Sequence, residues 1–251
     1  MRLKLFNKHY YLKRGIFDFE KLVEVDKYLL LTLNGSESLY WDGCMTVYTT
    51  TMVWIPLAVV LLYVLIKNNN IKTFFILLIA ITLVFVITDG VTSTICKPLF
   101  ERFRPTRDPE LMYYVDVVNG YRCAAYGFMS SHAANSFGIA TFIMLLMRNR
   151  VLSLSLFIWA MLNCYSRVYL GVHYPGDILG GITVGVLGGV LMYKLYKFIC
   201  NKIRNAGSRD WISTQYTKSG YLVSDIHLLL MVLYGTFAAI PIIAFFTLQQ
   251  H

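Results

Sequence analysis

The sequence predicts an all-α integral membrane protein in which six helices form one compact bundle. Apolar residues make up 57% of the 251 residues and charged residues only 15%, and the mean hydropathy is +0.55. A soluble domain carries a much larger charged fraction. Apolar stretches of about 18 or more residues can cross the hydrocarbon core of a bilayer as helices. The predicted spans are residues 45–66, 74–96, 132–147, 151–170, 178–199 and 226–248.

Three local features shape the predicted bundle. The third span is short, and residues 148–150, Arg-Asn-Arg, predict a tight turn into the fourth. Gly181, Gly185 and Gly189 recur every four residues on the fifth span, so we expect them to let a neighbouring helix approach closely. Asp89 lies inside the second span, where an ionisable side chain is rarely without a function; a hydrogen bond to Thr88, Thr92 or a neighbouring helix is its alternative role.

Residues 1–44 are predicted to form a basic, interfacial segment ahead of a transmembrane domain at residues 45–251. Five cations lie within residues 1–16, but the apolar run of a cleavable signal does not follow them. Residues 17–33 alternate apolar and charged positions. This pattern fits a helix lying in the membrane interface and, about equally, a soluble cap on the bundle.

The net charge of +9 points to anionic lipid headgroups as partners and not to nucleic acid. The cations flank the spans instead of forming a water-facing surface with interleaved aromatic residues. Five scattered cysteines are typical of small buried hydrophobic residues. No cluster has metal-ligand spacing, so we expect neither a metal nor another cofactor. The pattern predicts no particular oligomeric state.

Loop charges predict the orientation in the membrane. Ten cations lie in the loops after the first, third and fifth spans, which marks those loops as cytoplasmic. The opposite ends of the spans would then face away from the cytoplasm, into the periplasm if the membrane is a bacterial inner membrane. With six spans, the basic N-terminus would face the same way, against the same rule, unless residues 17–33 partly insert.

Polar clusters recur at three span ends on that predicted outer side. The first cluster is Lys97 with Arg104, the second is Ser130-Ser131-His132, and the third runs from Ser166-Arg167 through His173 to Asp177. Three cations at one membrane edge suit a multiply charged anion, and arginine matches phosphate oxygens bidentately. For an isolated cation, snorkelling or a headgroup contact is the alternative, and we assign that role to Arg102 and Arg107.

The two histidines are candidates for opposite roles. Asp177, four residues after His173, can hold one imidazole nitrogen so that the other attacks phosphorus; capping the fifth span is its alternative role. His132, when protonated, can donate to a leaving group, and a structural hydrogen bond is its alternative. Ser130 and Ser131 either bind an anion or cap the third span. Two histidines with opposite protonation states predict a bell-shaped pH profile.

The spacing of these clusters resembles the three-part signature of the type 2 phosphatidic acid phosphatase family. Six residues separate Lys97 from Arg104-Pro105, five separate Arg167 from His173, and three separate His173 from Asp177. This family includes bacterial lipid phosphate and undecaprenyl diphosphate phosphatases and shares its core with vanadium haloperoxidases. The resemblance covers roughly residues 45–199, with the signature core at 97–177. Pro105 should also hold Arg104 in an extended conformation.

The resemblance implies a metal-independent reaction through a phosphohistidine on His173, which Asp177 orients while His132 protonates the leaving group. It also implies a set of phosphate-binding residues: Lys97, Arg104, Ser130, Ser131 and Arg167. The family usually has Pro-Ser-Gly-His where this chain has residues 129–132, Met-Ser-Ser-His. We expect this departure to alter substrate preference more than to abolish activity.

The sequence therefore predicts a membrane lipid phosphatase that removes phosphate from a lipid phosphate or diphosphate. Undecaprenyl diphosphate and lipid A phosphate rank highest as substrates, followed by phosphatidic acid and phosphatidylglycerophosphate. A lipid phosphotransferase is one alternative, because the same phosphohistidine can serve an acceptor alcohol. A non-catalytic lipid-phosphate binder or transporter is the other, although no clear repeat of the kind common in transporters is visible.

Overall fold

The computed structural model describes residues 19–203 and 215–249, and it is helical throughout, apart from loops and isolated bridges. The predicted all-α class is confirmed. The elements are α1 (Phe19–Leu33), α2 (Leu39–Thr49), η2 (Thr51–Trp54), α3 (Ile55–Asn68), α4 (Ile71–Asp89), η3 (Gly90–Cys96), α5 (Lys97–Phe100), η4 (Pro105–Arg107), η5 (Val118–Gly120), α6 (Ser131–Met147), α7 (Arg150–Tyr169), α8 (Pro175–Ile203) and α9 (Val223–Leu248).

Five helical stretches are long and apolar enough to cross a membrane, and α6 is a shorter apolar helix of 17 residues. The five stretches are Thr51–Asn68, Ile71–Phe100, Arg150–Tyr169, Pro175–Ile203 and Val223–Leu248. Together with α6 they correspond one for one to the predicted spans. Much of their surface faces outward with large apolar side chains, which suits contact with lipid chains. The chain is thus an integral membrane protein.

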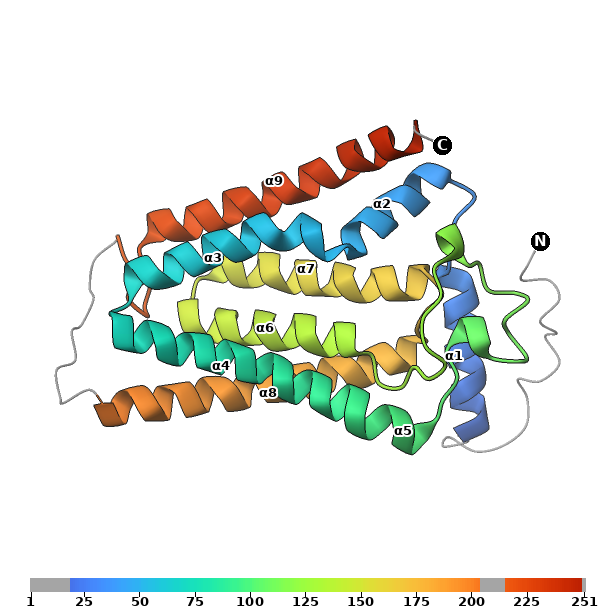
Figure 1. Cartoon of the computed structure of the whole chain (residues 1–251), viewed down its shortest axis with the longest axis horizontal. Coiled ribbons are helices and arrows are strands. Elements are labelled where there is room, and N and C mark those ends of the chain that lie inside the picture. The colour runs from blue at the N-terminus through green and yellow to red at the C-terminus, as the bar shows by residue number, and fades with distance from the viewer. Residues whose placement is uncertain (1–18, 204–214, 250–251) are drawn as a thin grey trace.

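Helix α6 lies at the centre of the bundle, with α4, α7 and α8 packed around it (Figure 1). The predicted close approach of α8 is confirmed. Cβ atoms added to Gly181, Gly185 and Gly189 would lie 2.4, 2.4 and 2.6 Å from backbone carbonyl oxygens of α6 and of its N-cap residue, Ser130. Any larger side chain at these positions would push the helices apart, so the glycines fix how closely α8 seats on α6.

The turn between α6 and α7 also forms as predicted. Arg148 ends α6 in the left-handed region, with φ of 49°, and the side chain of Asn149 accepts a hydrogen bond from the N–H of Leu152 at 3.0 Å. Asn149 therefore caps α7. The tight reversal keeps α6 and α7 antiparallel neighbours, which sets the start of α6 and the end of α7 at the same end of the bundle.

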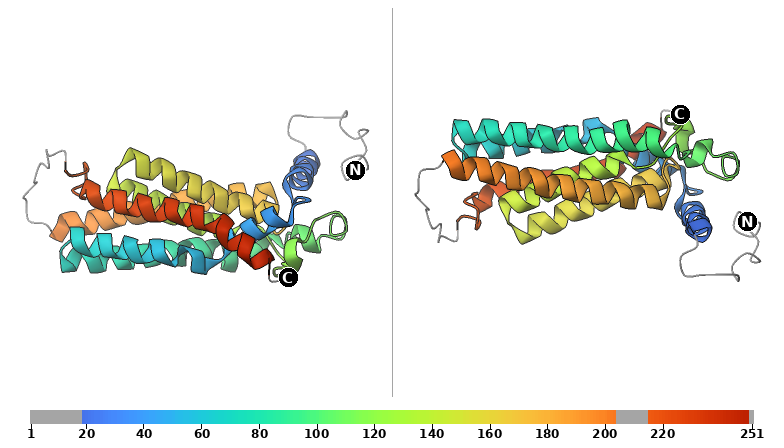
Figure 2. Two further views of the ribbon diagram at one scale, coloured as in Figure 1. Left: turned by 90° about the horizontal axis from the view of Figure 1, so that it is seen from above. Right: turned by 90° about the horizontal axis from the view of Figure 1, so that it is seen from below.

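At that end, α1 runs crosswise to the bundle, beside the long loop that joins α5 to α6 (Figures 1 and 2). The stretch predicted as the first span divides into α2, η2 and α3, and α2 already begins at Leu39. The domain boundary at residue 45 stays a prediction. The predicted basic residues 1–16 and the loop cations Arg204 and Arg209 lie outside the described residues.

Candidate active site

His173 and Asp177 form a buried pair in the turn between α7 and α8. The Nδ1 atom of His173 lies 3.3 Å from Oδ2 of Asp177, and the same oxygen accepts a hydrogen bond from the N–H of Tyr174 at 3.1 Å. On the other side of the ring, Nη1 of Arg104 donates to Nε2 of His173 at 2.9 Å. These contacts assign the proton to Nδ1 and the lone pair to Nε2. The predicted orienting contact of Asp177 is present.

Arg104 reaches His173 from the loop after α5. Its backbone is extended, with φ of −69° and ψ of 154°, as Pro105 predicts. Its Nε also donates to the carbonyl of Tyr126 at 3.0 Å and its Nη1 to the carbonyl of Val172 at 3.1 Å, so three hydrogen bonds fix the guanidinium. A Cβ added to Gly127 would lie 3.0 Å from Cγ of Arg104 and 3.1 Å from Oδ2 of Asp177. A side chain at residue 127 would force Arg104 and Asp177 to shift by a few tenths of an ångström, so glycine suits the close approach of this loop to both.

Lys97 begins α5, directly after the π-helical segment η3, and points at the start of α6. Its Nζ donates to the hydroxyls of Ser131 at 2.8 Å and Ser93 at 2.9 Å. The Ser131 hydroxyl is also 3.0 Å from the hydroxyl of Thr92. The lysine is therefore held by neutral hydroxyl groups. The predicted pairing of the first and second clusters in space is observed.

Arg167, near the end of α7, is the third cation, and only 2% of its surface is exposed. Its Nη1 donates to the hydroxyl of Thr49 at 2.7 Å, and its guanidinium lies over the ring of Tyr121 at 5.4 Å. The buried Nε of Arg167 has no hydrogen-bond partner among the described residues. A buried N–H without an acceptor is costly, so this donor is free for a bound anion.

The positive charge of these three cations is not balanced by protein carboxylates. In residues 19–203 and 215–249, neither Lys97 nor Arg104 nor Arg167 forms a salt bridge with an acidic side chain. Burying a charge without a partner is unfavourable. The arrangement therefore favours an anion bound next to Nε2 of His173, and phosphate matches the donor geometry.

The start of α6 forms the remaining wall. Ser130 caps the helix by accepting from the N–H of Ala133 at 3.4 Å, and its own N–H donates to the carbonyl of Asp177 at 3.0 Å. Phosphate binding by Ser130 stays a prediction that requires these contacts to open. His132 is exposed and interacts electrostatically with His173 and with all three cations. It thus faces the same site as the pair.

The charge state of His173 follows from its surroundings. Burial, reinforced by Arg104, Arg167 and Lys97, lowers the pKa of His173 well below its usual 6.5. The imidazole is therefore neutral at pH 7, which leaves the Nε2 lone pair available for attack. Burial and the three cations together outweigh the opposing backbone hydrogen bond at Gly127.

Comparison with known proteins identifies the family. The model of the PAP2 superfamily matches residues 75–199. The chain is 41% identical over 186 residues to the lipid A 4'-phosphatase of Bacteroides thetaiotaomicron, which covers 73% of this chain and 80% of that protein. It is 35% identical over 179 residues to the lipid A 4'-phosphatase of Porphyromonas gingivalis, covering 71% and 76%. The chain belongs to the PAP2 superfamily.

A solved structure gives the same fold for the superfamily core. The PAP2-type phosphatidylglycerolphosphate phosphatase from Bacillus subtilis superposes with a TM-score of 0.55 over 74% of this chain and 90% of that one, at 21% identity. At this identity the likeness concerns the fold alone. The expected family resemblance is confirmed, and with it the bundle core that carries the predicted site residues.

Within this PAP2 site, the role assigned to Arg102 was wrong. We expected snorkelling or a headgroup contact, but Nη1 of Arg102 donates to Oδ1 of Asp177 at 2.8 Å and Nη2 donates to Oδ2 of Asp26 at 2.7 Å. Arg102 precedes Arg104 by two residues in an extended segment, and such residues share a face. That spacing was the available signal. Asp26 could not be found this way, because it lies on α1, 76 residues earlier.

The departure from the family motif at residue 131 has a local explanation. The Ser131 hydroxyl accepts from Lys97 and thereby holds the lysine against the start of α6. A glycine at this position would lack that hydroxyl. Asp89 has a different partner from the threonines that we considered, since the hydroxyl of Ser93, one of the acceptors around Lys97, donates to Oδ1 of Asp89 at 3.1 Å. Ser131 and Asp89 thus both lie in the hydrogen-bond network around Lys97.

Proposed function

We propose that this chain is a membrane lipid phosphatase that cleaves a phosphate monoester or diphosphate from a lipid. The observation that carries the proposal is the set of three cations around a neutral histidine, none of which forms a salt bridge within residues 19–203 and 215–249. A simple structural role would not need unpaired buried charge at this point. A phosphate dianion supplies the missing charge and presents phosphorus to Nε2 of His173.

The reaction follows from the contacts in two steps. Nε2 of His173 attacks phosphorus, forming a P–N bond while the bond between phosphorus and the lipid oxygen breaks, and His132 donates a proton to that oxygen. His132 then takes a proton from a water that attacks phosphorus; the P–N bond breaks, phosphate leaves, and both Nε2 of His173 and the protonated His132 are restored. Arg104, which now donates to Nε2, would move its hydrogen bond to a phosphate oxygen as the substrate enters. The three cations stabilise the charge on phosphorus in both steps.

The lipid A 4'-phosphatase relatives make the phosphate of lipid A our first choice of substrate, and undecaprenyl diphosphate remains the second. We further propose that the site opens away from the cytoplasm, on the periplasmic face of a bacterial inner membrane. In support, Arg148, Arg150 and Lys197 line one depression at the opposite end of the bundle, consistent with a cytoplasmic face there.

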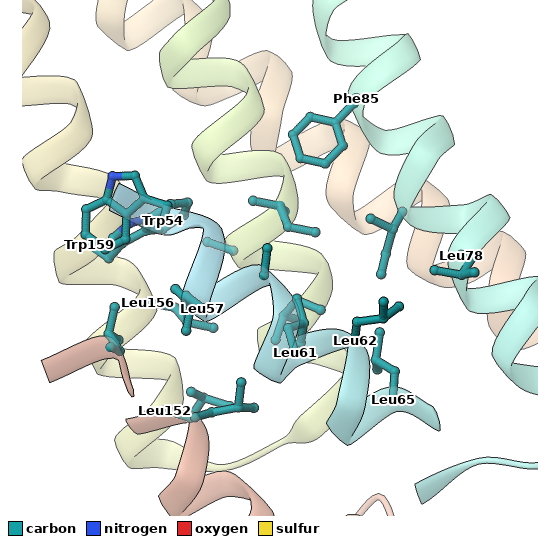
Figure 3. A pocket seen from close by; sticks show the side chains of 17 residues that line it. Trp54, Leu57, Leu61, Leu62, Leu65, Leu78, Phe85, Leu152, Leu156 and Trp159 are labelled. Carbon is teal, nitrogen blue, oxygen red and sulfur yellow. The ribbon is translucent and has the colours of Figure 1, made fainter. Parts of the chain in front are cut away.

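An apolar cavity supports a lipid substrate. The cavity, of about 350 Å³, is lined by η2, α3, α4, α6, α7 and α9, and its labelled lining consists of leucines with Phe85, Trp54 and Trp159 (Figure 3). Ile139 and Ile143 of α6 line it too. Ile139 lies seven residues after His132 on the same helical stripe, about 10 Å along the axis. A lipid with its phosphate at His132 would direct an acyl chain towards this cavity.

Phosphate release by the purified protein tests the proposal. A panel of lipid A, undecaprenyl diphosphate, phosphatidic acid and phosphatidylglycerophosphate, assayed with and without a chelator, should show turnover of at least one lipid in both conditions. His173→Ala should abolish it, and retained wild-type activity in this variant would rule out the mechanism. Loss of activity in chelator alone would contradict metal independence. Mass spectrometry of the lipid products separates hydrolysis from transfer to a second lipid.

A further inference from the structure

Arg102, in the loop after α5, links helix α1 to the pair formed by His173 and Asp177. Asp177 is fully buried, and its two oxygens are divided between neighbours. Oδ2 faces Nδ1 of His173, while Oδ1 accepts from Nη1 of Arg102 at 2.8 Å. Because a carboxylate is planar, fixing Oδ1 also fixes the direction in which Oδ2 points. The orientation of His173 therefore depends on where the Arg102 guanidinium is held.

Besides Asp177, two groups hold that guanidinium. Its Nη2 donates to Oδ2 of Asp26 at 2.7 Å, and its plane lies over the ring of Tyr174 at 4.1 Å. The hydroxyl of Tyr174 in turn donates to Asp108 at 2.7 Å. Asp26 is itself held, since its Oδ1 accepts from the N–H of Gly176, in the first turn of α8, at 2.7 Å. The arginine thus bridges a carboxylate on α1 and a carboxylate on α8.

Negative and positive charges alternate along the series Asp177, Arg102 and Asp26. Burial alone would lower the pKa of Arg102, but the carboxylates of Asp177 and Asp26 outweigh it and raise the pKa. Without Asp26, the guanidinium would keep only Asp177 as a partner. An arginine with one carboxylate prefers a bidentate geometry, which engages both oxygens. Arg102 would then compete with His173 for Oδ2.

We propose that Asp26 and Arg102 are positioning residues of the phosphatase: Asp26 holds Arg102 to one oxygen of Asp177, so that the other oxygen orients His173. The contact makes α1 part of the active centre, although α1 supplies no group to the substrate. This inference rests on the proposed function for its kinetic consequences, but the orientation of His173 can be measured without turnover.

Asp26→Asn is the main test, because it keeps the shape of the side chain and removes its charge. We expect kcat on the lipid substrate to fall about 10- to 100-fold with KM within about 2-fold of wild type, since a small misplacement of a catalytic group has effects of this size. Glu110→Gln is the matched control. Glu110 pairs with Lys27, the neighbour of Asp26 on α1, and this pair does not touch Asp177. Its loss should leave kcat unchanged.

A second readout separates this inference from the proposed function. In 15N-histidine NMR, the signal of the His173 Nδ1–H tautomer, assigned with His173→Ala, should persist in Glu110→Gln and shift in Asp26→Asn. If wild type hydrolyses no lipid but this shift occurs, the proposed function fails and the positioning role stands. If Asp26→Asn matches wild type in kcat and in the spectrum, the positioning role is overturned.

The proposal stays testable if Asp26→Asn does not give monodisperse protein. Arg102→Lys then carries the test, because lysine keeps the charge but cannot bridge two carboxylates with a planar fork. The same fall in kcat and the same change in the His173 signal are expected. Wild-type behaviour of Arg102→Lys would overturn the proposal as well.

Discussion

Gly185→Ala should loosen the contact between α6 and α8. A Cβ at residue 185 would lie 2.4 Å from the carbonyl oxygen of Ala134, about 1 Å closer than an ordinary van der Waals contact. Because that oxygen belongs to backbone, it cannot rotate away as a side chain can. We therefore take the upper end of the overpacking range, about 3 kcal/mol. Alanine gains about 1 kcal/mol of helix propensity over glycine, which leaves about 2 kcal/mol of destabilisation.

This destabilisation corresponds to a fall of about 4–8 °C in Tm for a chain of this size. The assay is thermal unfolding in detergent at one fixed heating rate, followed by tryptophan fluorescence. Gly235→Ala on α9 is the matched control, because no atom of another element in the described residues lies within 4 Å of a Cβ added at that position. Only the propensity gain of about 1 kcal/mol applies there, so its Tm should rise slightly. If both alanine variants shift Tm upward together, the close-packing argument is refuted.

Three further predictions concern the site and the cavity. Plotted against pH, kcat/KM should fall on the acid side only below pH 6.5, because the lowered pKa of His173 keeps it neutral above that range; an acid limb above pH 6.5 would contradict a neutral His173 at pH 7. Thermal stability should fall as pH drops below about 6.5, where the unfolded chain binds a proton that buried His173 does not. Ile139→Trp, which fills the cavity, should lower kcat/KM for a long-chain lipid phosphate about 10-fold more than for a short-chain one. Leu187→Trp, on the exposed face of α8, is the control and should leave the ratio of the two kcat/KM values unchanged. Equal chain-length ratios in the two variants would argue against an acyl chain in the cavity.

The helices and most of the site were predictable because their signals are local. Apolar stretches of spanning length mark the membrane helices, and the period of four in Gly181, Gly185 and Gly189 marks a packing face. Pro105 determines the extended backbone of Arg104 through its own ring. The clusters at 97–104, 130–132 and 166–177 lie at span ends on one side, which predicts their meeting in space.

The partners of Asp177 were not predictable in the same way. Arg102 looked like an ordinary membrane-edge cation, and its role depends on a carboxylate from α1, which crosses the end of the bundle. The glycine at residue 127 likewise shows its function only against Arg104 and Asp177. Each of these contacts joins segments far apart in the chain, so no spacing or period in the sequence reports it.

The sequence by itself determined the class of the protein, its spans and the chemical groups available for phosphate, because hydropathy, helix period and residue type act over a few turns. The tertiary structure decided which cations remain without a carboxylate and which one is neutralised. That distinction depends on distances of about 3 Å between separate helices and loops, where a single packing arrangement selects the partner of each charge. Lys97, Arg104 and Arg167 are left for an anion, while Arg102 is held by Asp26 and Asp177.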